Sequence, residues 1–234
     1  MKTKQTEGPI KTEAAESVIM PFTYAEDEHY YVETLGEIRK KPIYSFAKRL
    51  FDILFSFVAL ILLLLPMLII AAAIKCTSKG SVFYKQERLG LNGKRFKIVK
   101  FRTMVSDAEK DGAQWALGAD DKRVTKVGAF LRKYRIDELP QLLACLTGQL
   151  SIVGPRPERE VFYDLFETHV HGFRERMKVK PGLTGLAQIN GGYDLRPEEK
   201  VVYDVEYIKK RSFWLDMKIL LKTVAVVLKH DGAK

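Results

Sequence analysis

Residues 53–74 read ILFSFVALILLLLPMLIIAAAI, which is 22 residues in succession without a charged side chain. About 20 apolar residues suffice for a helix to cross the hydrocarbon core of a bilayer, so this stretch predicts a membrane-embedded helix. Pro66 stands inside it, where a proline removes one helical hydrogen bond and clashes with the preceding turn. The sequence therefore predicts a helix that is broken near Leu65 and Pro66.

Basic residues flank this apolar segment on both sides. They are Arg39, Lys40, Lys41, Lys48 and Arg49 before it, and Lys75, Lys79, Lys85 and Arg88 after it. Because basic flanks tend to stay on the cytoplasmic side of a membrane, the pattern favours a re-entrant helix that enters and returns on one face. A straight spanning anchor with an incidental proline is the alternative.

The charge is divided unevenly along the chain of 234 residues. Residues 1–38 hold three lysines and eight acids, a net charge of −5, whereas the whole chain carries +10. The remainder therefore carries +15, which indicates an anionic partner such as anionic membrane lipid, a nucleotide or nucleic acid. Nucleic acid is disfavoured, because the sequence has no helix-turn-helix, zinc or aromatic RNA-binding signature.

These patterns divide the chain into four parts. Residues 1–38 are predicted to be an acidic, loosely ordered tail, and residues 39–79 a basic amphipathic lead-in followed by the membrane helix. Residues 80–229 are predicted to form a mainly helical α+β domain on the cytoplasmic side, and residues 230–234 a short tail.

Local patterns predict the elements of that domain. A turn signal at residues 90–93 predicts a β-hairpin between residues 81–84 and 95–101. Helical spacing is found at residues 127–134, 137–146, 158–177 and 213–229, the last as a core helix or a membrane-surface helix. His169 and His171 would point to different faces of the third helix, which disfavours a metal site.

Two adjacent acids, Asp137 and Glu138, are the first candidates for chemistry. Acids at the start of a helix often serve only as caps. Here Arg132, Lys133 and Arg135 precede them. A carboxylate pair beside cations supplies what phosphoryl transfer needs, since one carboxylate can attack phosphorus while Mg²⁺ or an arginine neutralises the phosphate oxygens.

Three further stretches carry candidate substrate-binding residues. Arg156 lies between two prolines, which hold it extended and suit it to bidentate phosphate recognition. Lys100 and Arg102 share one face of the expected strand. Residues 180–188, KPGLTGLAQ, form a glycine-bearing stretch that ends at Gln188, and its glycines are explained most simply as turn formers.

The order of these motifs resembles the bacterial sugar transferase family. Behind the proline-containing apolar segment come residues 100–104 (KFRTM), 137–141 (DELPQ), 153–157 (VGPRP) and 180–185 (KPGLTG). The resemblance covers about residues 44–225 and points to the monotopic phosphoglycosyl transferases that prime glycan assembly. It implies an enzyme of the bacterial inner membrane whose catalytic domain lies on the cytoplasmic face.

The resemblance also implies an activity. A sugar 1-phosphate would pass from a UDP-sugar to polyprenyl (undecaprenyl) phosphate with release of UMP, as the first step of exopolysaccharide, capsule or glycoconjugate synthesis. By this resemblance Asp137 is the nucleophile that carries the phosphosugar, and Glu138 positions or deprotonates the acceptor and assists with Mg²⁺. Arg132 and Arg156 would hold phosphate groups, with Lys100, Arg102 and Gln188 completing the substrate-binding set, and Pro66 would bend the re-entrant helix.

Four further points concern the membrane part, the oligomeric state, an alternative function and the transferred sugar. Multi-pass relatives carry extra spanning helices, which residues 1–38 cannot supply, so a minimal form is expected; a homodimer is left open. The alternative function is a non-enzymatic, membrane-anchored basic adaptor, which would not need the acid pair. The transferred sugar is not indicated by any pattern.

Overall fold

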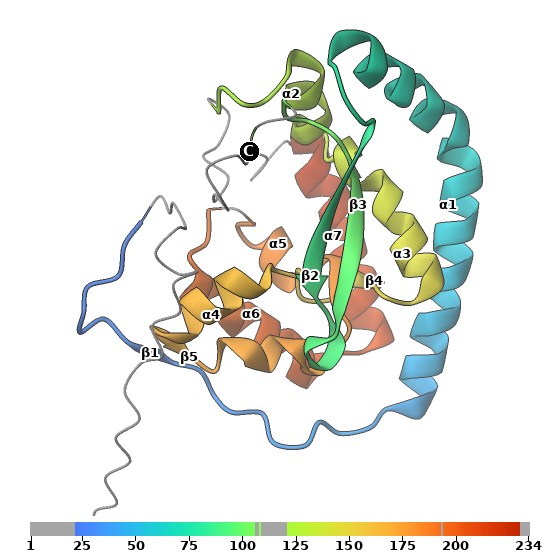
Figure 1. Ribbon diagram of the computed structural model, residues 1–234. Helices are drawn as coiled ribbons and strands as arrows, with labels where there is room; N and C mark the ends of the chain where they lie inside the picture. The colour runs from blue at the N-terminus through green and yellow to red at the C-terminus, as the bar shows by residue number, and fades with distance from the viewer. Residues whose placement is uncertain (1–21, 106–107, 109–120, 193, 230–234) are drawn as a thin grey trace, which may run out of the picture.

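The computed structural model describes residues 22–105, 108, 121–192 and 194–229. The described chain is mainly helical, and its strands form three separate two-stranded sheets (Figure 1). The helices are α1 (Pro42–Thr77), α2 (Lys126–Lys133), α3 (Leu142–Thr147), α4 (Glu160–Glu167), α5 (Leu186–Ile189), α6 (Pro197–Lys210) and α7 (Phe213–Lys229), with 3₁₀ turns η2 (Leu91–Gly93), η3 (Ile136–Gln141) and η4 (Phe173–Lys178). The strands are β1 (Tyr30–Tyr31), β2 (Phe83–Leu89), β3 (Arg95–Phe101), β4 (Ser151–Val153), β5 (Val170–His171) and β6 (Gly182–Thr184).

The long apolar segment forms α1, which is continuous through Pro66. The predicted break is therefore wrong: the helix bends instead, and Figure 1 shows it curving over the domain toward its C-terminal end. Among the described helices it is the one long and apolar enough to cross a membrane. Its outer face is bare, with Leu62 and Leu65 exposed by 72% and 68%, so this face needs an apolar environment.

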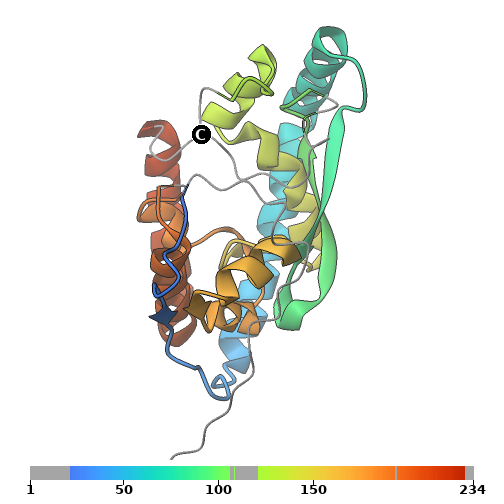
Figure 2. The same ribbon diagram turned by 60° about the vertical axis from the view of Figure 1, so that its left-hand side comes forward.

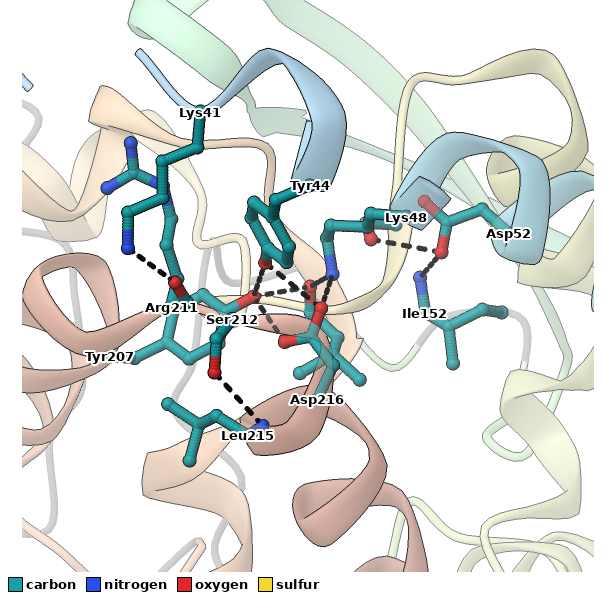
Figure 3. Close-up of polar contacts among 12 residues, drawn as sticks. Lys41, Tyr44, Lys48, Asp52, Ile152, Tyr207, Arg211, Ser212, Leu215 and Asp216 are labelled. Carbon is teal, nitrogen blue, oxygen red and sulfur yellow. Dashed lines mark hydrogen bonds and ion pairs between the residues drawn. The ribbon is translucent and has the colours of Figure 1, made fainter. Parts of the chain in front are cut away.

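A buried polar network joins the start of α1 to the rest of the domain (Figure 3). The Lys48 ammonium donates to Asp216 Oδ2 of α7 at 2.7 Å and to the Val153 carbonyl at 2.8 Å. The Tyr207 hydroxyl of α6 donates to Asp216 Oδ1 at 2.9 Å, and Asp52 accepts from the Ile152 amide at 2.9 Å. Lys48 of the basic lead-in thus ties the start of α1 to α7 and to the chain at Val153.

The other end of α1 is held by apolar packing. Ile74 lies in a small core with Phe101 of β3 and Leu131 of α2. In the turned view of Figure 2, α1 and the β2–β3 hairpin stand together on one side, with α6 and α7 on the other. Both ends of α1 therefore contact the same domain.

The hairpin is confirmed, whereas the predicted long helix at residues 158–177 is wrong. β2 and β3 pair antiparallel in register from Phe83 with Phe101 to Leu89 with Arg95. The helix starting at Glu160 ends at Glu167, and Gly172 then adopts a left-handed φ of 91° that no helix interior accepts. α7 has the predicted bounds, and α6 was not predicted.

Within residues 22–38, which belong to the segment predicted to be a loosely ordered tail, two contacts join the chain to the domain. β1 pairs in parallel with β5, and Leu35 lies in the main core. His169 and His171 stack on His29 instead of lying on a helix. Residues 1–21 and 230–234 lie outside the described residues.

Candidate active site

The two candidate carboxylates lie in η3, which is a tight 3₁₀ turn. Arg135, just before it, adopts a left-handed φ of 55°, which is rare for a residue with a side chain and turns the chain sharply after α2. The helix predicted at residues 137–146 thus begins as η3 and becomes regular only in α3. Asp137 and Glu138 are each 8% exposed and line one cavity.

Glu138 is the paired acid of the two. Its carboxylate accepts from the Lys100 ammonium at 2.6 Å and from Arg156 Nη1 at 3.2 Å. These partners lie 38 and 18 positions away in the sequence. Among the described residues the Asp137 side chain has no hydrogen bond or ion pair, and so its oxygens remain available to a ligand.

The surroundings of Asp137 and Glu138 shift the pKa values of the two carboxyl groups in opposite directions. Burial raises the pKa of Asp137 to about 6, and the neighbouring charge of Glu138 adds to the rise while Lys100, Arg132 and Arg156 oppose it. Burial also disfavours ionisation of Glu138, but Arg156 and Lys100 outweigh it and hold that pKa well below its usual range. A more basic carboxylate without a cation bound to it is the better nucleophile, which favours Asp137.

Arg132 is positioned by close backbone packing. α2 approaches the chain after β3 so closely that a Cβ on Gly128 would lie 2.0 Å from the Thr103 carbonyl oxygen. Arg132 Nε then donates to Thr103 Oγ1 at 3.0 Å, while its Nη1 is buried without a hydrogen-bond partner in the described part of the chain. A buried donor of this kind is costly unless a ligand accepts from it.

Arg102 and Gln188 both line the cavity, but they differ in their hydrogen-bond partners within the protein. Arg102 donates to the carbonyl and hydroxyl of Ser78 at 2.9 and 2.8 Å, so it caps the C-terminal end of α1 as well as lining the cavity. Gln188 is 7% exposed and lines the cavity, and neither atom of its amide has a partner among the described residues. Their substrate-binding roles stay predictions.

The glycines of the VGPRP and KPGLTG motifs serve close packing rather than turns. β4 and β6, which carry these motifs, pair in parallel, with Ser151 opposite Gly182. A Cβ on Gly182 would lie 2.1 Å from the Gly154 nitrogen, and one on Gly185 would lie 2.2 Å from the Gly154 oxygen. The two motifs thus meet backbone to backbone, and this contact places Arg156 beside Glu138.

The cavity around these residues has a volume of about 410 Å³. Its described lining includes ten basic and three acidic residues. The basic ones are Arg88, Lys100, Arg102, Arg123, Arg132, Arg135, Arg156, Arg159, Arg176 and Lys200, and the acids are Asp137, Glu138 and Glu158. Such an excess of buried positive charge fits a ligand with several negative charges. Arg88, Arg176 and Lys200 were not predicted, because nothing in their local sequence distinguishes them from surface cations.

The acid pair is chemically suited to Mg²⁺. This ion prefers oxygen ligands and usually takes one or two carboxylates, with substrate phosphates and water filling the remaining positions. The open Asp137 carboxylate fits that pattern, and Glu138 has oxygen lone pairs beyond those used by Lys100 and Arg156. No cluster of three or more metal-ligating side chains exists among the described residues, so substrate would have to supply most of the ligands.

The described residues thus combine one helix that is long and apolar enough to cross a membrane with a cation-lined cavity that contains two carboxylates. The family model described as bacterial sugar transferase matches residues 43–230, and the chain belongs to that family.

Curated relatives agree with this assignment. An undecaprenyl-phosphate N-acetylgalactosaminephosphotransferase of Aeromonas hydrophila is 41% identical over 88% of this chain and 49% of its own length. An undecaprenyl-phosphate glucose-1-phosphate transferase of Klebsiella pneumoniae is 46% identical over 76% of this chain and 39% of its own. The exopolysaccharide production protein ExoY of Rhizobium meliloti is 38% identical over 89% of this chain and 96% of its own length. This chain thus spans half or less of the first two relatives and nearly all of the third.

Proposed function

We propose that this protein transfers a sugar 1-phosphate from a UDP-sugar to undecaprenyl phosphate and releases UMP. The observation that carries the proposal is the Asp137 carboxylate, which has no partner among the described residues, beside a cation-bound Glu138 in a cavity with a large excess of positive charge. The names of the transferases supply the substrate class, and the name of ExoY, an exopolysaccharide production protein, supports a place at the first step of such a pathway.

In the first step Asp137 attacks the β-phosphorus of the UDP-sugar. The bond from that phosphorus to the bridging oxygen breaks, and the oxygen leaves with its electron pair on UMP. Arg132 donates from its buried Nη1 to a phosphate oxygen, while Lys100 and Arg156 keep Glu138 ionised and in place. The product is a phosphosugar on Asp137.

In the second step an oxygen of undecaprenyl phosphate attacks the same phosphorus and the Asp137 carboxylate leaves. The acceptor attacks through an ionised phosphate oxygen, so no proton has to be removed, and Glu138, whose pKa is held well below its usual range, helps to position the acceptor. Mg²⁺, held by Asp137 and Glu138 together with phosphate oxygens, would neutralise charge on the transferred group. Two substrates of different solubility thus need the cavity only in turn.

The test uses purified protein in detergent with Mg²⁺, undecaprenyl phosphate and a panel of UDP-sugars. We expect UMP release with at least one sugar, and its loss when EDTA removes the metal. If none of the sugars yields UMP, the activity is refuted and the basic adaptor becomes the remaining function. The sugar that reacts identifies the donor.

We expect the rate of adduct formation to rise with pH through about 6. Asp137 attacks only as the carboxylate, and burial raises its pKa to about 6, so the protonated, inactive form is populated below that value. Higher Mg²⁺ concentrations should move this rise in rate to lower pH, because the metal ion and the proton compete for the same carboxylate. Quenched-flow measurement of kcat/KM for the UDP-sugar provides the profile. A rate that is constant from about pH 5 to about pH 7 would contradict the assignment.

We further propose that α1 is re-entrant and that the domain lies on the cytoplasmic face of the inner membrane. Lys48 and Ile74, near the two ends of α1, contact one domain, which cannot lie on both sides of a bilayer. Native Cys76 is exposed, and so is Lys40. In inverted membrane vesicles we expect an impermeant maleimide to label Cys76, and also a cysteine placed at Lys40 in a variant lacking Cys76. Labelling of the two from opposite sides would instead establish a spanning anchor.

A further inference from the structure

Residues 22–38 lie outside the part of the chain that the family model matches, which begins at residue 43. They run through β1, beside β5, toward the start of α1 (Figure 1), and we call them the N-terminal strap. None of them belongs to the described lining of the cavity. The strap nevertheless contacts two elements that do line it, η4 through Arg176 and α6 through Lys200.

Tyr24 anchors the strap to the beginning of α6. Its hydroxyl donates to Glu198 Oε2 at 2.7 Å, and Glu198 is 9% exposed and lies two positions before Lys200. Arg196 adds to this anchor, because its guanidinium carbon lies 5.0 Å from the centroid of the Tyr24 ring and its Nη2 pairs with Glu28 of the strap at 3.1 Å. Hydrogen bonds to charged groups are stronger than those between neutral groups, so Tyr24 helps to fix the N-terminal end of α6.

Leu35 anchors the strap to η4. Its amide donates to Glu175 Oε2 at 2.7 Å, and Lys178 both donates to the Leu35 carbonyl and pairs with Glu175 at 2.7 Å. Arg176 directly follows Glu175 in the sequence. η4 is a 3₁₀ segment of six residues, whereas such helices rarely exceed three or four because their hydrogen-bond geometry is poor. The shape of η4 therefore depends on contacts from outside, and the strap supplies some of them.

The two anchored elements together form one wall of the cavity. Arg176 of η4 pairs with Asp204 of α6 at 2.6 Å, and both side chains are 1% exposed. The strap is thus bonded to both partners of this buried pairing. In contrast, no hydrogen bond or ion pair joins the strap to η3, β3 or α2 in the described part of the chain, and these elements carry Asp137, Lys100 and Arg132. A change in the strap should therefore affect one wall of the cavity and leave the reacting carboxylate in place.

We propose that the N-terminal strap is a positioning element, which holds η4 and α6 in the arrangement that binds the UDP-sugar without itself touching the substrate. This inference rests on the proposed function. The donor carries two phosphate groups and the acceptor one, so donor binding should depend more on a wall that bears cations. When only part of the molecules have the binding arrangement, the apparent affinity falls by that fraction. Loosening the strap should therefore weaken donor binding and leave the reaction at Asp137 intact once the donor is bound.

The experiment compares Tyr24→Phe with Tyr31→Phe, since each removes one hydroxyl from the strap. Tyr31 is 81% exposed, and its hydroxyl has no hydrogen bond among the described residues. KM for the UDP-sugar and kcat for UMP release are measured well below the thermal midpoint. We expect KM to rise by about 3-fold in Tyr24→Phe and by about 10-fold or more when Leu35→Ala is added, with kcat within about 2-fold of wild type. Tyr31→Phe should match wild type. A wild-type KM in both Tyr24→Phe and the double variant, or a fall in kcat alone, would overturn the proposal.

Hydrogen exchange separates positioning from a general loss of stability. In Leu35→Ala we expect the amides of residues 173–178 to exchange faster than in wild type, while those of β3 and α7 keep their rates. Saturating UMP should restore much of the protection, because the ligand and the strap stabilise the same arrangement. Equally faster exchange throughout the protein would overturn the proposal. A wild type that releases no UMP would instead refute the proposed function, so the two failures are distinguishable.

Discussion

Asp137→Asn is expected to lower sugar-phosphate transfer by a factor of about 10³ or more and to abolish the covalent adduct. Asparagine has nearly the same shape, but its amide cannot attack phosphorus. The Asp137 side chain has no hydrogen bond or ion pair among the described residues, and burial raises its pKa, so folding gains nothing from the charge. The thermal midpoint should stay unchanged or rise. Intact-mass spectrometry after mixing with the UDP-sugar measures the adduct, and UMP release measures the rate.

Two further variants identify which carboxylate carries the sugar phosphate. Glu138→Gln should still form the adduct, though slowly, because it loses its ion pairs with Lys100 and Arg156. Asp164→Asn, which removes a partly exposed acid paired with Arg174 outside the cavity, should react as wild type. An adduct that persists in Asp137→Asn and disappears in Glu138→Gln would move the nucleophile to Glu138.

Gly182→Ala is expected to lower the free energy of unfolding by about 3 kcal/mol and also to lower the rate of UMP release strongly. The added Cβ would lie 2.1 Å from the Gly154 nitrogen and 2.6 Å from its Cα, and backbone atoms cannot rotate aside. Separating β4 from β6 breaks the bond from the Gly182 amide to the Pro155 carbonyl, at 2.8 Å, and displaces the neighbouring Arg156 from Glu138. Thermal unfolding in detergent and the UMP assay measure the two effects.

Gly36→Ala is the matched control, because nothing lies within 4 Å of a Cβ at that position. It should unfold and react as wild type. Equal stability of Gly182→Ala and Gly36→Ala would show that the contact between the two glycine motifs is not tight. A destabilised Gly182→Ala that keeps full activity would show that Arg156 does not depend on it.

Features that depend on neighbours in the chain were predictable. The apolar run of α1, the hairpin around residues 90–93 and the amphipathic spacing of α7 each follow from patterns within one segment. The order of the four motifs identified the family. One prediction failed because of a distant segment: residues 170–171, expected to be helical, pair with β1 as strand β5. Another failed locally, because α1 continues through Pro66 where a break was predicted.

The chemistry of the site depends on contacts that sequence spacing does not encode. Asp137 and Glu138 are adjacent and similar, yet Lys100 and Arg156 approach only Glu138 closely enough for an ion pair. Lys200 reaches the cavity only through the packing of α6, a helix that no pattern predicted. The residue types of the site and the long apolar helix thus follow from the linear order of amino acids. The ionisation of each carboxylate was decided by folding, because burial and the charges of distant residues set a pKa.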